Sequence, residues 1–163
     1  MDAVDELLVG FLEAQRGRVF EVLAGLDERQ LRQVVLPSGW APLGLVEHLG
    51  YAERHWFQQV MLGAAEPVPW EDDEDNDSGP LSTTRSTEVV FGFYRDEIAR
   101  ANDVLASTSL SAAPIGRHGV GPEPAELRVI VLHMIEETAR HLGHLDAARE
   151  LIDGAVGLGQ DEW

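Results

Sequence analysis

The sequence has no cysteine and no lysine among its 163 residues. Without cysteine the chain can form neither a disulfide framework nor a thiolate metal site, and it has no thiol nucleophile of its own. Without lysine it cannot form a Schiff base with a carbonyl substrate. No apolar run approaches the roughly 18 residues of a membrane span, and the start, MDAVDELLVGF, is acidic where a secretory signal is basic. We therefore expect a soluble, cytoplasmic protein.

Positive charge is also scarce. The 12 basic residues are all arginine and are outnumbered by 29 acidic residues, so the formal net charge is −17 at pH 7. Phosphate binding depends on clustered basic side chains, so this charge argues against nucleic acid and against anionic membranes as partners. With 44% apolar and 25% charged residues the composition is that of a globular protein. The length suits one domain, which we predict to span residues 1–163.

Apolar residues recur with helical period in four long segments. Cap and stop signals bound these segments: Asp2 and Ser86 suit helix starts, Pro42 suits a first turn, and Gly154 suits an end. The predicted helices cover residues of about 2–24, 42–62, 86–107 and 124–153. Together they predict an all-α fold, a four-helix bundle.

The connection from Ala64 to Thr84 has no periodicity and is long for a compact domain. Its run WEDDEDNDSG lacks the glycine and the distal glutamate of an EF-hand, so we interpret it as a solvated acidic loop rather than a calcium site. A connection of this length is expected if the second and third helices are parallel. We therefore predict a long crossover between them.

The last predicted helix carries polar residues on its core side. In LRVIVLHMIEETARHLGHLDAAREL, from Leu127 to Leu151, Glu137, His141 and His144 share one side with the apolar residues of the core. Burying a carboxylate and imidazoles among apolar residues costs free energy unless hydrogen bonds or a bound ion compensate for their lost hydration. Glu137 and His141 are four residues apart, which places their Cβ atoms about 5–6 Å from each other. This spacing allows two side chains to hold one metal ion.

The second predicted helix supplies a further candidate ligand, His48. Metal sites in bundles are built from inward side chains on facing helices. Three nitrogen and oxygen donors with an open position match catalytic zinc, and they also match the facial triad of non-haem iron. These donor types alone do not choose the metal. We expect a divalent ion and take zinc as the first choice, with nickel and iron as alternatives. The metalloprotease motif HExxH is absent.

The structural alternative is that these side chains only bond to one another. A lone core histidine is usually just hydrogen-bonded, and a Glu-x-x-x-His pair is usually a surface contact. For His55 and His118 a structural role is favoured by the residues alone. His133 and His144 lie near the Glu137 side of the helix, so each could support the site without binding the ion.

Two segments carry a family resemblance, SGWAPLGLVEHLGYAERHWF and LHMIEETARHLGHLDAARELIDG. With the helix order and the long second connection, the chain resembles the DinB-like (DinB/YfiT-type) superfamily of metal-binding four-helix bundles, in an uncharacterised branch. That superfamily includes mycothiol- and bacillithiol-dependent transferases. Many members have three histidine ligands, where this chain has His48, Glu137 and His141. The metal-binding domain of mycothiol-dependent maleylpyruvate isomerase is similar in using two histidines and one glutamate.

The resemblance implies that His48, Glu137 and His141 are the ligands and that His144, after Gly143, lies next to the site. It also implies a transferase that uses a low-molecular-weight thiol of the mycothiol type and a small-molecule electrophile. His144 or His55 could then serve as proton carrier. The alternatives are a non-catalytic metal-binding stress-response protein and a purely structural bundle.

Homodimers are common in similar proteins. Two apolar residues of the last predicted helix, Ile135 and Leu142, fall outside its core stripe. We expect them to be exposed and to permit a homodimer.

Overall fold

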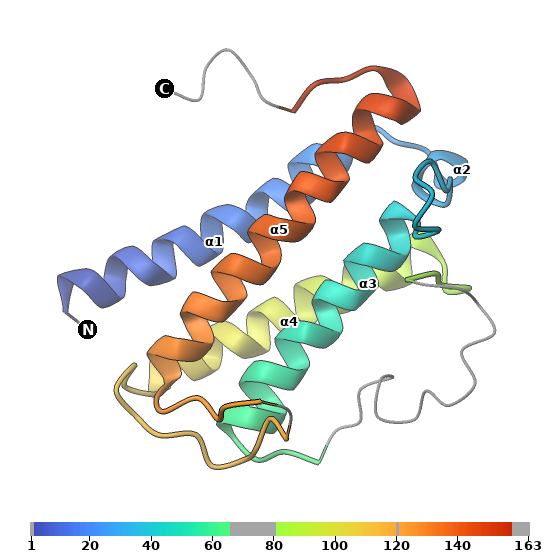
Figure 1. Ribbon diagram of the computed structural model, residues 1–163. Coiled ribbons are helices and arrows are strands. Elements are labelled where there is room, and N and C mark those ends of the chain that lie inside the picture. Colours follow the sequence, from blue (N-terminus) through green and yellow to red (C-terminus); the bar gives the residue numbers. More distant parts are fainter. Residues whose placement is uncertain (1, 66–80, 120, 158–163) are drawn as a thin grey trace.

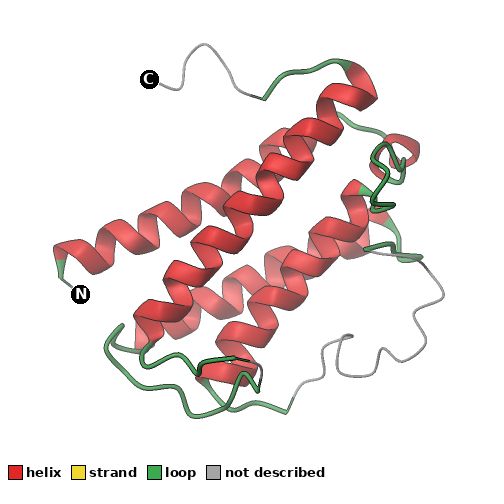
Figure 2. Ribbon diagram, viewed as in Figure 1, coloured by secondary structure: helices red, strands yellow, loops and turns green. Residues whose placement is uncertain are grey.

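The computed structural model describes residues 2–65, 81–119 and 121–157. Over these ranges the only regular secondary structure is helical, which confirms the predicted all-α class (Figure 2). The helices in chain order are α1 (Ala3–Leu23), α2 (Glu28–Leu31), α3 (Pro42–Glu53), the π-helix η1 (Arg54–Met61), α4 (Thr87–Ser107) and α5 (Leu127–Asp153). The acidic run of the predicted crossover lies outside the described residues. No described helix combines the length and apolar character that a membrane crossing requires.

Helices α1 and α5 lie side by side and run in the same direction (Figure 1). Near their starts, Asp5 forms an ion pair with Arg128 at 2.9 Å. Near their ends, a guanidinium nitrogen of Arg149 donates to the carbonyl oxygen of Val22 at 2.7 Å. The first and the last helix of the bundle are therefore direct neighbours.

Packing of α1 against α5 corrects one expectation. Leu142 is only 6% exposed, because it belongs to an apolar core cluster that also contains Val19 of α1. Ile135 is partly buried and packs against the other core cluster. The prediction that these two residues present an exposed apolar face was wrong, so they do not support a homodimer.

Helices α3 and α4 form a second parallel pair. Glu47 of α3 pairs with Arg85, just before α4, at 2.9 Å, and Arg54 at the start of η1 pairs with Glu97 of α4 at 2.7 Å. The two pairs run antiparallel to each other, as in the four-helix bundle of Figure 1. Consecutive parallel helices need a long connection, so the predicted crossover is confirmed.

Helix starts follow the local signals in three cases. The Asp2 carboxylate accepts backbone N–H groups at the start of α1, the Ser86 hydroxyl accepts that of Val89, and Pro42 occupies the first turn of α3. Helix α5 begins at Leu127 rather than at Pro124. Backbone N–H groups of its first two residues donate to carbonyl oxygens of the preceding loop, at residues 110 and 112.

The second long helix is not uniform. After Glu53 the regular α-helix of α3 changes to η1, a π-helix of eight residues. Such i→i+5 segments are rare and occur often at functional sites. Hydropathy predicts one helix over this stretch and gives no sign of the change. The segment carries His55, Trp56 and Gln59, whose positions depend on it.

A buried ion pair crosses the bundle interior. Arg16 of α1 and Glu53 of α3 are each 1% exposed, and two nitrogens of the guanidinium donate to the two carboxylate oxygens at 2.7 and 2.5 Å. Asn102 of α4 accepts a third bond from Arg16 at 2.9 Å. The pair therefore ties three helices together through groups that have lost their hydration. Sequence patterning did not single out either residue.

Candidate metal centre

Three predicted ligands converge between α3 and α5. The Nε2 atoms of His48 and His141 lie 3.1 and 2.9 Å from the same oxygen, Oε1 of Glu137. Each residue offers one ligand atom, and these atoms all lie within 4.8 Å of one another. Because α3 packs antiparallel to α5, His48 lies opposite Glu137 and His141, which are one helical turn apart on α5. We call these three residues the triad.

The triad is partly open to solvent. The side chains of His48, Glu137 and His141 keep 25%, 21% and 14% of their surface exposed. The triad is therefore not fully enclosed, as a closed structural metal site would be. The exposure is consistent with the open position predicted from the three-donor set.

The electrostatics of the triad favour a cation. Hydrogen bonds from His141 and His48 hold the pKa of Glu137 well below its usual range, so this side chain is a carboxylate at neutral pH. Nδ1 of His141 is buried and has no hydrogen-bond partner among the described residues. Two imidazoles and one carboxylate are the donor types of catalytic zinc and of non-haem iron. The residues present therefore fit a divalent ion.

His144 lies beside the triad. It is exposed, and its ring centroid is 5.7 Å from that of His141 and 5.8 Å from that of Trp40. His133, one turn before Glu137, packs its ring against Trp56 at 4.4 Å. Burial lowers the pKa of His133, and the nearby carboxylates of Glu136 and Glu137 oppose this effect.

His55 does not join the triad. It is on η1, seven residues after His48, and is 6% exposed. Its Nδ1 contacts Oε1 of Gln59 at 2.5 Å, and its Nε2 contacts Nδ1 of His118 at 2.9 Å. The structure thus places the two predicted proton carriers differently, with His144 beside the triad and His55 in a separate cluster with His118.

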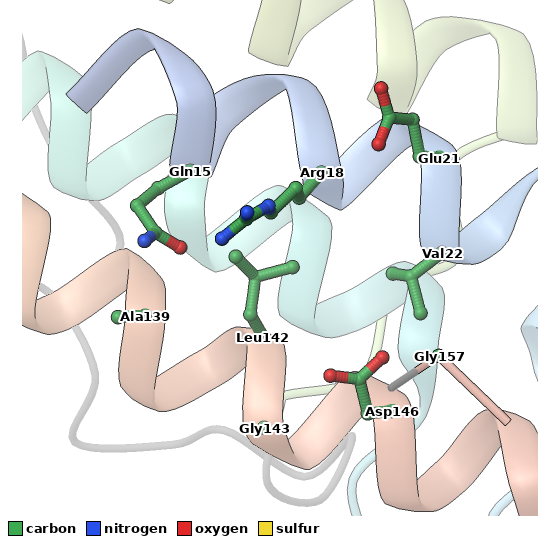
Figure 3. A pocket seen from close by; sticks show the side chains of 9 residues that line it. All are labelled: Gln15, Arg18, Glu21, Val22, Ala139, Leu142, Gly143, Asp146 and Gly157. Carbon is green, nitrogen blue, oxygen red and sulfur yellow. The ribbon is translucent and has the colours of Figure 1, made fainter. Parts of the chain in front are cut away.

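A pocket of about 370 Å³ lies between α1 and α5 (Figure 3). Gln15 and Arg18 of α1 line one wall, and Ala139 and Leu142 of α5 line the other. At about 100° per residue, Ala139 lies about 160° around the helix from both Glu137 and His141, and Leu142 lies about 100° from His141. The pocket therefore does not open on the triad.

The fold and the triad together define a class of protein. It is the class of four-helix bundles in which histidine and carboxylate side chains able to bind a metal lie on facing helices. Residues 7–154 match the family described as mycothiol-S-transferase, and the chain belongs to this DinB-like family. No curated protein matches the sequence. Among solved structures, the chain is similar to a conserved protein from Enterococcus faecalis, with a TM-score of 0.70 and 15% identity over 95% of this chain and 100% of the other. That likeness concerns the fold alone.

Proposed function

We propose that the protein is a divalent-metal-dependent thiol S-transferase that joins a small sugar thiol of the mycothiol type to an electrophilic small molecule. The observation that carries the proposal is the convergence of His48, Glu137 and His141 at a solvent-accessible point, in a chain of the mycothiol-S-transferase family. Because the chain has no cysteine, the sulfur nucleophile must come from a cosubstrate.

The triad would hold the ion, with zinc as the first choice. When bound, a divalent ion lowers the pKa of a thiol and makes a thiolate available near neutral pH. The sulfur forms a bond to the electrophilic carbon of the acceptor, and the leaving group departs with its electron pair. Glu137 would contribute the one negative charge of the triad, which would favour binding of a dication by these three residues.

The proton released by the thiol needs an acceptor. His144 is exposed and adjacent to His141, so in this mechanism it takes the proton and passes it to water. His55 is less suited to this role, because both of its ring nitrogens already contact side chains of its own cluster. We therefore assign the role of proton carrier to His144.

The test combines metal analysis with thiol consumption. We expect the purified protein to bind about one equivalent of divalent metal, and zinc to raise its melting temperature because the ion binds only the folded chain. Mycothiol should be consumed with at least one member of a panel of electrophiles. His48→Ala should lose the metal, the thermal shift and the consumption together.

Glu150→Gln, at an exposed position near the end of α5, serves as the control and should behave as the unmodified protein. Metal binding without any metal-dependent thiol consumption would contradict the transferase and favour a non-catalytic metal-binding protein. Absence of both metal binding and thermal shift would leave the triad as a hydrogen-bonded network of the bundle.

A further inference from the structure

A second polar cluster is built where η1 meets the loop before α5. His55 and Gln59 of η1 and His118 of the loop line a pocket of about 310 Å³, together with Gly63, Gly116 and Arg117. We call it the η1 pocket. Its lining offers imidazole, amide and guanidinium groups, and the remaining residues are glycine and alanine. This chemistry suits a ligand with many hydrogen-bonding groups better than an apolar one.

The loop is fixed to the end of the π-helix. Backbone N–H groups of Ile115 and Gly116 donate to the carbonyl oxygens of Met61 and Val60 at 3.0 and 2.9 Å. Residue 116 must be glycine for this contact, because a Cβ there would overlap the carbonyl oxygen of Gln59. The η1 pocket is therefore held by main-chain bonds, and the position of His118 follows from them.

Hydrogen bonds of the backbone and the ring, together with a ring contact, hold His118 in place. The carboxylate of Glu123 accepts its backbone N–H at 2.8 Å, and its ring lies 4.4 Å from that of Trp56 with 30° between the planes. His55 donates from Nδ1 to the amide oxygen of Gln59, so in a neutral ring its Nε2 must accept. His118 then donates from Nδ1 to Nε2 of His55. In this tautomer Nε2 of His118 carries no hydrogen, so it can accept a hydrogen bond from a ligand.

The charge state of His118 agrees with this assignment. Partial burial and the neighbouring His55 lower the pKa of His118, while the carboxylate of Glu123 opposes them. Among the described residues, Arg117 lines the same pocket, and His133 is close enough for His118 to lower its pKa. At neutral pH the ring is therefore uncharged, and its Nε2 is able to accept a hydrogen bond from a ligand.

The η1 pocket and the triad lie along the same face of the bundle. The ring of Trp56 contacts that of His118 and, at 4.4 Å, that of His133. On α5, four residues separate His133 from Glu137, which corresponds to about 6 Å along the helix. On α3 and η1, seven residues separate His48 from His55, or about 10 Å. A ligand about 10 Å long would match this separation between the triad and the η1 pocket along the helices.

We propose that the η1 pocket binds the hydroxyl-rich sugar part of the thiol cosubstrate, with Nε2 of His118 accepting a hydrogen bond from a sugar hydroxyl. The assignment rests on the proposed function, because it places the sulfur of the same molecule at the triad. His118 is thus a binding residue that selects a sugar thiol over a simple thiol. His55 and Gln59 position its ring.

Kinetics with two thiols test this selection. His118→Asn keeps a donor near the Nδ1 position for His55 and removes the Nε2 atom, whereas His118→Gln keeps a polar atom near Nε2. For His118→Asn we expect the KM for mycothiol to rise about tenfold, the effect of one lost hydrogen bond, with kcat unchanged. The KM for N-acetylcysteine, a thiol without sugar, should not change, and His118→Gln should recover part of the loss. Equal effects on both thiols, or no effect, would overturn the proposal.

Direct binding separates this proposal from the proposed function. The probe is the sugar half of mycothiol without its thiol, titrated by calorimetry into the full-length protein. We expect binding that is weakened about tenfold by His118→Asn and by Gly116→Ala, and that is unchanged by Glu137→Ala. Binding with this pattern supports the pocket even if no thiol is transferred. Failure of the unmodified protein to bind, or binding indifferent to His118→Asn in a folded variant, overturns it.

Discussion

Glu137→Ala is expected to lower the affinity of the protein for divalent metal by at least about a hundredfold. Removing a residue that only hydrogen-bonds to a metal ligand already lowers metal affinity about 10–100-fold, and Glu137 is itself one of the proposed ligands. The substitution removes the one anionic donor of the triad and leaves the imidazoles of His48 and His141 as its two remaining donors. Both imidazoles also lose their shared acceptor, Oε1 of Glu137, so their rings are no longer held toward each other. Thiol transfer should fall with the bound metal.

Competition titration with a chromophoric chelator measures this loss, and elemental analysis of the purified variant checks it. Glu137→His is the matched comparison, because three histidines are the set that the resemblance associates with many related bundles. We expect it to keep most of the metal affinity, whereas Glu137→Gln, which keeps the shape but not the charge, should bind weakly. A Glu137→Ala protein that retains metal as the unmodified protein does would show that the ion binds elsewhere.

Glu53→Ala is expected to destabilise the fold by about 3–5 kcal/mol, the typical cost of removing one partner of a buried ion pair. Arg16 is 1% exposed and gives two of its bonds to Glu53. The variant would leave a guanidinium inside the bundle with Glu13 and Asn102 as its remaining partners. The cost comes mainly from leaving this buried charge with only the half-exposed carboxylate of Glu13 as its anionic partner, and not from lost attraction.

Urea unfolding followed by circular dichroism measures the change in the free energy of unfolding. The control is the double variant Arg16→Met with Glu53→Leu, which replaces the pair by apolar side chains of similar size. Such replacements are often neutral or stabilising, so the double variant should be clearly more stable than Glu53→Ala. If the single and double variants lost equal stability, packing rather than charge would explain the effect.

Much of the fold could be predicted because its signals are local. Asp2, Pro42 and Ser86 act through backbone groups of their own first turn, and Gly154 adopts the left-handed conformation that ends α5. The length of the second connection predicted that the helices on either side of it are parallel. The start of α5 was misplaced by three residues, because its first N–H groups bond to carbonyl oxygens of residues 112 and 110 in the preceding loop and not to a local cap.

The triad could be predicted because Glu137 and His141 are polar residues on an apolar stripe and lie one turn apart. His48 came from the same argument on the facing helix. The hydrogen bonds of His55 with His118 could not be predicted, since the two residues are 63 positions apart and depend on a π-helix that hydropathy does not indicate. Leu142 was misjudged because its burial depends on α1, which a helical wheel of α5 does not include.

The parallel pairing of α1 with α5 has a consequence for how fast the chain reaches its native state. Asp5 and Arg128, which join the starts of these helices, are 123 positions apart, and His48 and Glu137 are 89 positions apart. Proteins dominated by such distant contacts fold more slowly than helical proteins with mostly local ones, because the entropy of closing long loops is lost before the contacts form. We therefore expect this bundle to fold more slowly than an up-and-down bundle of equal length, and its triad to assemble late, after α5 has docked.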